Sequence, residues 1–118
     1  MGVETAAVLA IIENYVLGTR TRDEALLRSI FHDEAQMFGR IGARDVAAPI
    51  LSYIAHAATS DPGETYEATI RGAEVFGSSA VAVLEERNYQ GLNFLDYFSL
   101  VEVGGAWVIV TKLFGVVE

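Results

Sequence analysis

The chain has 118 residues, of which 52% are hydrophobic and 20% are charged. This length suffices for one domain with its own core, and this composition excludes a disordered chain. The chain contains no cysteine, which excludes a disulfide framework, a thiolate metal site and a cysteine nucleophile. Sixteen acidic and eight basic residues give a net charge of −8. This balance argues against a nucleic-acid partner, because such proteins bind phosphates through Lys and Arg.

The start of the chain has neither the pattern of a secretory signal nor that of a membrane anchor. A secretory signal begins with basic residues, but the only early charge is Glu4. The apolar run over residues 6–12 is far shorter than the roughly 20 residues that cross a membrane. We therefore expect a cytoplasmic protein without a membrane partner.

Helical periodicity characterises the first part of the chain. Val8, Ile12 and Tyr15 recur at helical spacing, which predicts an amphipathic helix over residues 3–17. Gly18 follows directly and is a typical helix terminator.

Two more helices and a short strand are predicted before residue 60. The segment Thr21–Glu24 has the pattern of a capping box, in which the Thr hydroxyl and the Glu carboxylate bond free amides. The predicted elements are a helix over about 22–31, a strand over 34–40, a turn at 41–45 and a helix over about 46–58 with Pro49 in its first turn.

From Glu64 onward the apolar period changes to two, which indicates strands. The alternation slips by one residue at Gly72, and such a slip at a glycine predicts a β-bulge. Turn signals at residues 77–79, 90–91 and 104–105 separate the strands. The predicted strands cover residues 64–76, 80–89, 92–103 and 106–117.

Helices followed by strands favour an α+β domain over an alternating α/β one. We expect a single domain over residues 1–118. Its three N-terminal helices would pack on one face of a curved, mainly antiparallel sheet, which consists of a four-stranded meander and one short strand.

Asp96 is the most informative residue of the predicted sheet, because its carboxylate stands on a face of aromatic and aliphatic side chains. Two-residue loops on both sides would place it opposite Glu85 and Leu113. The same register puts Arg87 on its face and Lys112 on the opposite face. Asp96 then either points into a cavity, where the low dielectric favours its protonated form, or pairs with Arg87 in a structural network.

Four segments of the chain together resemble the nuclear-transport-factor-2-like superfamily over almost the whole length. They are Ile12–Tyr15, Ile30–Ala35, Leu95–Phe98 and Trp107–Phe114. The last three are most similar to the lumazine-binding branch of that superfamily, which also includes ketosteroid isomerases, polyketide cyclases and scytalone dehydratases. The resemblance implies a cone-shaped α+β barrel in which helices and a bent sheet enclose one pocket.

The resemblance also suggests roles for polar residues. Ketosteroid isomerases hold an oxyanion with a tyrosine on the first helix and a protonated aspartic acid on a late strand, and Tyr15 and Asp96 match these positions. The general base of that family falls on Gly39, so we do not expect a steroid isomerase. His32 is the remaining candidate base, with a capping role as the alternative, whereas His56 is expected to be a packing residue or to lie at the solvent edge.

From these observations we expect a protein that binds a small, apolar, ring-containing molecule in an enclosed pocket. Tyr15 and Asp96 are the candidate polar groups. The candidate walls are Phe38, Phe94, Phe98 and Trp107. The alternative is an isomerase, dehydratase or cyclase in which Tyr15 and Asp96 stabilise an oxyanion and His32 acts as the base. A third possibility is an interaction module whose pocket is filled by its own side chains.

We expect no cofactor and no metal site, because nothing at ligand spacing would complete a His32/His56 pair. The outer sheet face is predicted to be a large apolar patch, which monomers rarely expose. It would carry Tyr97, Val101, Val108, Val110, Phe114 and Val116. We therefore expect a homodimer that forms through this face.

Overall fold

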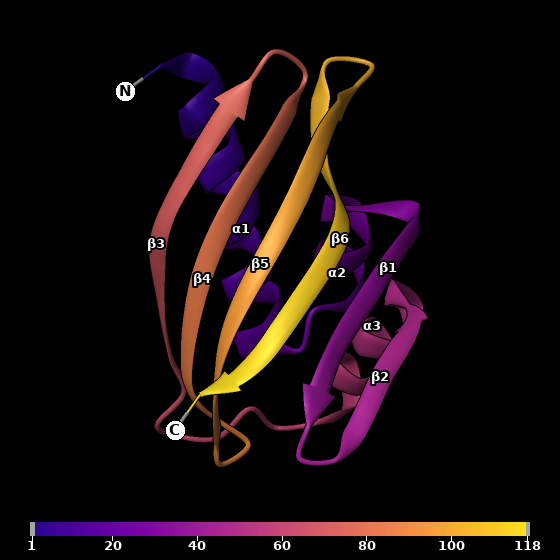
Figure 1. The fold of residues 1–118 in the computed structure, drawn as a ribbon, viewed down its shortest axis with the longest axis vertical. Helices are drawn as coiled ribbons and strands as arrows, with labels where there is room; N and C mark the ends of the chain where they lie inside the picture. The colour runs from indigo at the N-terminus through magenta and orange to yellow at the C-terminus, as the bar shows by residue number, and fades with distance from the viewer. Residues whose placement is uncertain (1, 118) are drawn as a thin grey trace.

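A computed structural model describes residues 2–117 and contains three helices on one face of a six-stranded sheet (Figure 1). The helices are α1 (Val3–Thr21), α2 (Glu24–Ile30) and α3 (Ile50–Thr59). The strands are β1 (Phe31–Ile41), β2 (Arg44–Pro49), β3 (Glu67–Phe76), β4 (Ser79–Tyr89), β5 (Leu92–Val103) and β6 (Ala106–Val117). Within these residues no helix is long and apolar enough to span a membrane.

The strand order is β2-β1-β6-β5-β4-β3, and all neighbouring strands are antiparallel except β1 and β6. The predicted α+β class and the mainly antiparallel sheet are confirmed. The sheet is not closed into a barrel, because β2 and β3 remain its two edges.

Helix α1 continues past its predicted end at Gly18 and stops at Thr21, where Arg22 adopts a left-handed conformation with φ 58°. Gly18 serves close packing instead. A Cβ atom added there would lie 2.8 Å from the side chain of Leu27 on α2. The N-cap of α2 is Asp23, whose Oδ1 accepts from the backbone N–H of Leu26 at 3.0 Å, so the predicted capping role of Thr21 is wrong.

The predicted helix over residues 46–58 begins four residues later, because the preceding segment forms an edge strand. Residues 44–49 pair with β1 as β2, and alternate side chains of this strand, those of Val46 and Ala48, are half-buried. Pro49 has no N–H to extend the ladder and stands at the N-cap of α3, directly before Ile50.

Three β-bulges set the register of strands β3 to β6. The predicted bulge at Gly72 is confirmed by a shift between Ile70 and Gly72. A second shift lies in β4, where Tyr89 pairs with Leu92 as expected but Glu86 pairs with Phe94. It coincides with the left-handed Asn88, whose φ is 59°.

The third bulge lies in β6. Leu100 pairs with Ile109 and Ser99 with Thr111, so Val110 has no partner in β5. A one-residue slip exchanges the two faces of a strand. Lys112 therefore faces the helices, and its predicted position on the outer face is wrong.

The bulge in β4 likewise exchanges the two faces of that strand. Glu86 is buried and its neighbours Glu85 and Arg87 face outward, the reverse of the prediction. The partners of Asp96 are Leu84 and Phe114 instead of Glu85 and Leu113.

A buried hydrogen bond joins the first and last helices. Thr19 on α1 and Tyr53 on α3 are 2.6 Å apart through their hydroxyl oxygens, 34 residues distant in sequence. Both side chains are at most 6% exposed. The bond therefore holds α3 against α1 from inside the protein.

We predict that Thr19→Val lowers the free energy of unfolding by about 1–2 kcal/mol, because the buried Tyr53 hydroxyl loses its partner. Thr21→Val on the same helix is the matched control, since the Thr21 hydroxyl bonds the Leu17 carbonyl at the exposed surface. This control should change stability by less than about 0.5 kcal/mol. Urea unfolding measures both variants, and equal losses would contradict the role given to the Thr19 bond.

Candidate functional site

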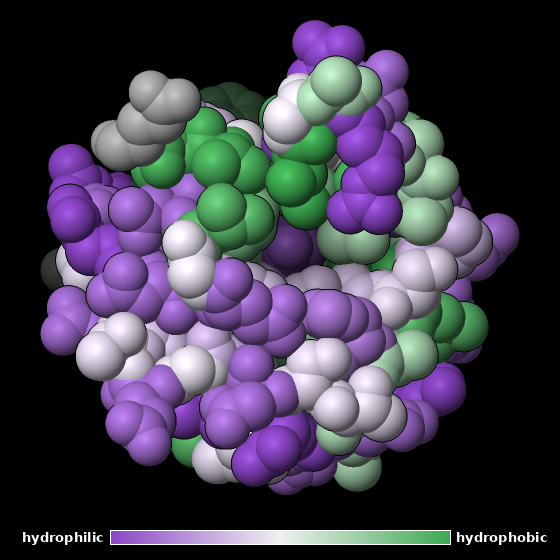
Figure 2. Space-filling model, turned by 90° about the horizontal axis from the view of Figure 1, so that it is seen from below, coloured by the Kyte–Doolittle hydropathy of each residue, from purple (hydrophilic) through white to green (hydrophobic). Residues whose placement is uncertain are grey.

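A cavity of about 390 Å³ opens at one end of the sheet, between α3, the β1–β2 hairpin and the turn that joins β4 to β5. Figure 2 shows this end of the molecule, where apolar side chains border the upper side of a hollow with a hydrophilic side chain at its bottom. The apolar part of the lining consists of Met37, Ile41, Val46, Leu92, Phe94 and Phe114.

The polar floor of the cavity is built on three neighbouring strands. Glu86 on β4 and Lys112 on β6 line the cavity, and each lies diagonally next to Asp96 on the central strand β5. All three are at most 6% exposed, and Asp96 is fully buried. The two bulges thus place two carboxyl groups and one amine on the same face of the sheet.

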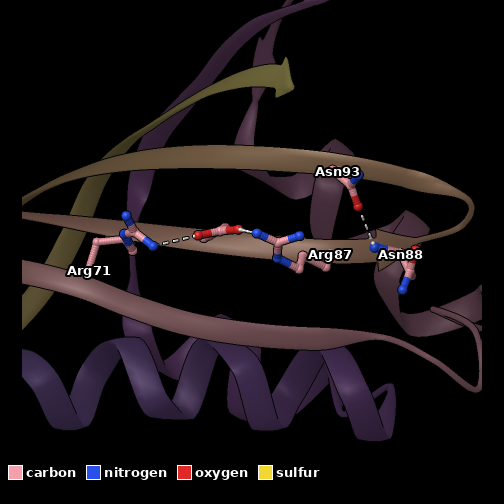
Figure 3. A network of polar contacts seen from close by, with 5 residues as sticks. Arg71, Arg87, Asn88 and Asn93 are labelled. Carbon is pink, nitrogen blue, oxygen red and sulfur yellow. Dashed lines mark hydrogen bonds and ion pairs between the residues drawn. The ribbon is translucent and has the colours of Figure 1, made fainter. Parts of the chain in front are cut away.

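Asp96 depends on Lys112 for charge compensation. The Lys112 Nζ lies 3.9 Å from Asp96 Oδ1, and neither oxygen of Asp96 has a hydrogen-bond partner within residues 2–117. Arg87, the partner considered from the sequence, lies on the opposite face. There it pairs with Glu85 at 2.6 Å, and Arg71 binds the same carboxylate at 2.8 Å (Figure 3).

The surroundings of Glu86 favour its protonated form. The Tyr66 hydroxyl donates to Glu86 Oε2 at 2.5 Å. Burial raises the pKa of Glu86 well above the ordinary 4.5, and the negative charge of Asp96 raises it further. The positive charge of Lys112 and the Tyr66 hydrogen bond oppose these effects without cancelling them.

Lys112 places its amine among aromatic rings. Its Nζ lies 4.4 Å from the ring centre of Tyr53, 5.0 Å from that of Phe114 and 5.9 Å from that of Tyr15. These are cation–π distances, and they stabilise an ammonium group that has little access to water.

Tyr89 contributes a polar group to the wall of the cavity, and His56 contributes one to its rim. The Tyr89 hydroxyl is buried and has no hydrogen-bond partner within residues 2–117. Burial and the charges of Glu86 and Asp96 raise the pKa of Tyr89 to about 12, so it is a neutral donor at physiological pH. His56 is exposed, and its Nε2 lies 3.0 Å from Oε1 of Gln90 at the mouth.

The two polar residues predicted for the pocket lie beneath it instead of lining it. Tyr15 stacks on Tyr53 with ring centres 5.5 Å apart, and its hydroxyl has no partner within the described residues. Burial raises the pKa of Tyr15 well above 10. Asp96 faces the same interior but is covered by its neighbours. Both support the floor through Tyr53 and Lys112.

His32 and three of the four predicted wall residues also lie outside the cavity lining. His32 is in β1, where its Nδ1 accepts from the backbone N–H of Glu34 at 3.0 Å. Phe38 is 45% exposed, because the alternation of β1 turns Met37 inward and Phe38 outward.

Phe98 and Trp107 belong to the core. Phe98 packs edge-on against Tyr15 with ring centres 4.9 Å apart, and Trp107 donates through Nε1 to Glu4 Oε2 at 2.8 Å. Phe94 does line the cavity. The residues that sequence analysis missed are Glu86, Lys112, Tyr53 and Tyr89.

Gly39, the position of the isomerase base, is closed by a neighbouring ring. A Cβ atom added there would lie 2.5 Å from the ring of Phe114. A carboxylate could occupy this position only if Phe114 moved.

The open curved sheet, the three helices on its concave side and the cavity at one end define a nuclear-transport-factor-2-like protein. The model of the family described as "Putative lumazine-binding" matches residues 3–115, and the chain belongs to this family. No curated protein matches the sequence.

Solved structures agree with this assignment. An NTF2-like protein of unknown function from Silicibacter pomeroyi is 26% identical, with a TM-score of 0.87 over 95% of this chain and 94% of that chain. A second NTF2-like protein of unknown function, from Methylobacillus flagellatus, is 22% identical with a TM-score of 0.90 over 100% and 96%. A ketosteroid isomerase-like protein from Erwinia carotovora atroseptica is 14% identical with a TM-score of 0.73 over 100% and 99%.

We predict that Glu86→Gln stabilises the protein more at pH 8 than at pH 4.5. A raised pKa means that the folded state binds the Glu86 proton more tightly than the unfolded state. This tighter proton binding contributes to the free energy of unfolding. The contribution is complete below the pKa of Glu86 in the unfolded chain, near 4.5, and is lost as the pH rises through the pKa of Glu86 in the folded protein. Gln has the shape of the protonated acid and does not titrate, so its advantage should appear with rising pH.

Thermal unfolding between pH 4.5 and 8 measures this difference. We expect the melting temperature of the variant to gain about 4 °C on the parent over this range, which is about 1 kcal/mol for a domain of this size. Glu85→Gln, on the outer face, is the control. A pH-independent difference between Glu86→Gln and the parent would contradict the raised pKa of Glu86 in the folded protein.

Proposed function

We propose that the protein binds one small, ring-containing molecule in the cavity and holds an oxygen atom of it at Lys112. The observation that carries this proposal is an amine at the bottom of a largely apolar cavity. A volume of about 390 Å³ is at the lower end of the range of ligand pockets, roughly 300–1,000 Å³. It suits one ring or two fused rings.

The contacts of Lys112 favour an acceptor oxygen on the ligand. An ammonium group has three N–H donors, whereas Lys112 has an ion pair at 3.9 Å and three aromatic neighbours. A carbonyl or phenolate oxygen would occupy a donor that these contacts leave free. The hydroxyl of Tyr89 offers a second donor on the wall.

The charges around the cavity support the same ligand. The protein carries a net charge of −8, yet the cavity is lined by Lys112 and Arg44, and the pKa of its one lining carboxyl group, Glu86, is raised. An electron-rich oxygen of the ligand therefore finds a positively charged cavity in a protein that is acidic as a whole. Lumazine, named in the family description, is a two-ring heterocycle with carbonyl oxygens and belongs in a first panel of test ligands.

We predict that a matching ring compound at about 100 times its Kd stabilises the protein by about 2.7 kcal/mol. For a domain of this size this corresponds to a melting temperature about 11 °C higher. Thermal shift with a panel of lumazines, pterins, flavins, steroids and phenols measures it. Lys112→Met should abolish the shift, because the ligand oxygen loses its donor.

The control for this experiment is Arg87→Met, which removes a cation from the outer face. It should leave the shift unchanged. Circular dichroism of Lys112→Met first establishes that the variant folds. An undiminished ligand shift in folded Lys112→Met would contradict the role of Lys112, and a panel without any shift would contradict the choice of ligand class.

A second candidate function, an isomerase, dehydratase or cyclase, is favoured by one observation. Glu86 is a carboxyl group with a raised pKa that lines the cavity next to Lys112, and such groups are typical proton carriers in enzymes. Glu86 would then move the proton and Lys112 would stabilise the oxyanion. Tyr15 and Asp96 would only support these two residues, and His32 lies outside the cavity lining.

We also propose a homodimer that forms through the outer face of β4, β5 and β6. Three apolar side chains are about half exposed on this face, Val81 at 52%, Tyr97 at 45% and Leu113 at 49%. They surround a shallow groove of about 340 Å³. The same face of a second copy could cover this patch. Phe114 and Val116, predicted for this face, point to the core because of the β6 bulge.

Sedimentation at micromolar concentration is expected to give twice the mass of the chain. Leu113→Glu should give the single-chain mass, because a charge would stand in the centre of the interface. Phe76→Glu is the control, since Phe76 is 88% exposed at the end of the edge strand β3 and outside the groove lining. A single-chain mass for the parent protein would exclude this dimer.

A further inference from the structure

Lys112 is the only lysine of the chain, which otherwise uses seven arginines. All seven arginines are exposed, whereas Lys112 is 6% exposed at the cavity floor. The two residue types differ in chemistry, because a guanidinium keeps its proton in proteins while an amine can lose its proton and attack a carbonyl carbon. The one residue of this chain with a nucleophilic side-chain amine therefore lies where a ligand would bind.

The titratable groups around Lys112 come from β4, β5, α1 and α3. Asp96 on β5 lies 3.9 Å from Nζ and can accept a proton. Glu86 on β4 carries a carboxyl group that lines the same cavity. Tyr53 on α3 and Tyr15 on α1 cover Nζ with their rings.

We propose that Lys112 binds an aldehyde or ketone on a ring compound covalently, as an imine. This proposal rests on the proposed function, because it assigns a carbonyl group to the ligand of the same cavity. Nζ is the nucleophile, Asp96 is the proton acceptor and Glu86 is the proton donor.

The step balances with these three residues and no other reactant. The Lys112 ammonium transfers one proton to the Asp96 carboxylate. The free amine attacks the carbonyl carbon, the N–C bond forms, and a proton moves from nitrogen to the carbonyl oxygen to give the carbinolamine. The C–O bond then breaks as Glu86 donates its proton, so that water leaves and the protonated imine remains. The positive charge stays on nitrogen, and the negative charge passes from Asp96 to Glu86.

The surroundings of Nζ also select for ring compounds. Phe94, Phe114 and Met37 line the cavity next to the floor, so a ring can pack on them while its carbonyl carbon meets the amine. Apolar walls also limit the water that reverses imine formation.

Reductive trapping tests the proposal in the full-length purified chain. The probe is 2-hydroxybenzaldehyde with sodium cyanoborohydride, and peptide mapping by mass spectrometry locates the reduced adduct. The α-amino group of the purified chain is the internal reference amine. We expect Lys112 to be labelled about tenfold faster than this reference. Glu86→Gln should slow labelling of Lys112 by about tenfold without changing labelling of the α-amino group.

A binding experiment in parallel separates the two proposals. The matched ligand is 2-hydroxybenzyl alcohol, which has the same ring but no carbonyl group. In one outcome, both the alcohol and the aldehyde raise the melting temperature while only the α-amino group is labelled. This outcome would overturn the imine and leave the binding function intact. Label on Lys112 at the rate of the reference and insensitive to Glu86→Gln would also overturn it. The absence of both shift and Lys112 label would overturn both proposals for compounds of this size.

Discussion

The charge of Asp96 is the constraint on which the rest of the site depends. Its carboxylate is fully buried, and neither oxygen has a hydrogen-bond partner within the described residues. Leaving such a charge without its partner costs about 3–5 kcal/mol in typical proteins, so Lys112 must stand on the same face. Only the unpaired Val110 puts it there, because a regular β6 would turn Lys112 toward the outer surface. The bulge, the ion pair and the cavity floor are therefore parts of one arrangement.

Glu86 adds a second acid to this arrangement and thereby determines its protonation. Two ionised carboxylates and one ammonium would leave a net negative charge in a nearly dry interior, which burial disfavours. The raised pKa of Glu86 follows from this condition. With the Glu86 proton in place, Asp96 and Lys112 balance each other. The cavity then presents a cation and a neutral acid, in a protein whose surface is acidic.

The strands could be predicted from the sequence, but the side chains that each strand turns toward the core could not. Strands over residues 92–103 and 106–117 and the bulge at Gly72 were predicted, because glycine pairs and an interrupted alternation indicate them. Around Val110 the run Trp107–Phe114 is apolar at both even and odd positions, so its pattern cannot indicate which set faces inward. In β4, Glu85 and Glu86 are adjacent and chemically alike, and only the bulge at Asn88 decides which is buried. The predicted register was wrong at these two points, although a lone lysine and an acidic pair were visible in the sequence.

The fold and the chemistry of the cavity depend on different features of this sequence. The cone of helices and sheet depends on long apolar patterns, and it persists in structures that are only 14–26% identical. The polar floor depends on bulges one residue long, which move a whole strand segment from one face to the other. Tyr15 and Asp96 were expected from the sequence resemblance to take the place of the oxyanion residues of ketosteroid isomerases. Here they lie beneath the cavity, and Phe114 covers Gly39. The bulges in β4 and β6 are therefore enough to bring other residues to the cavity without a change of fold, and the chemistry of this cavity follows from Glu86 and Lys112.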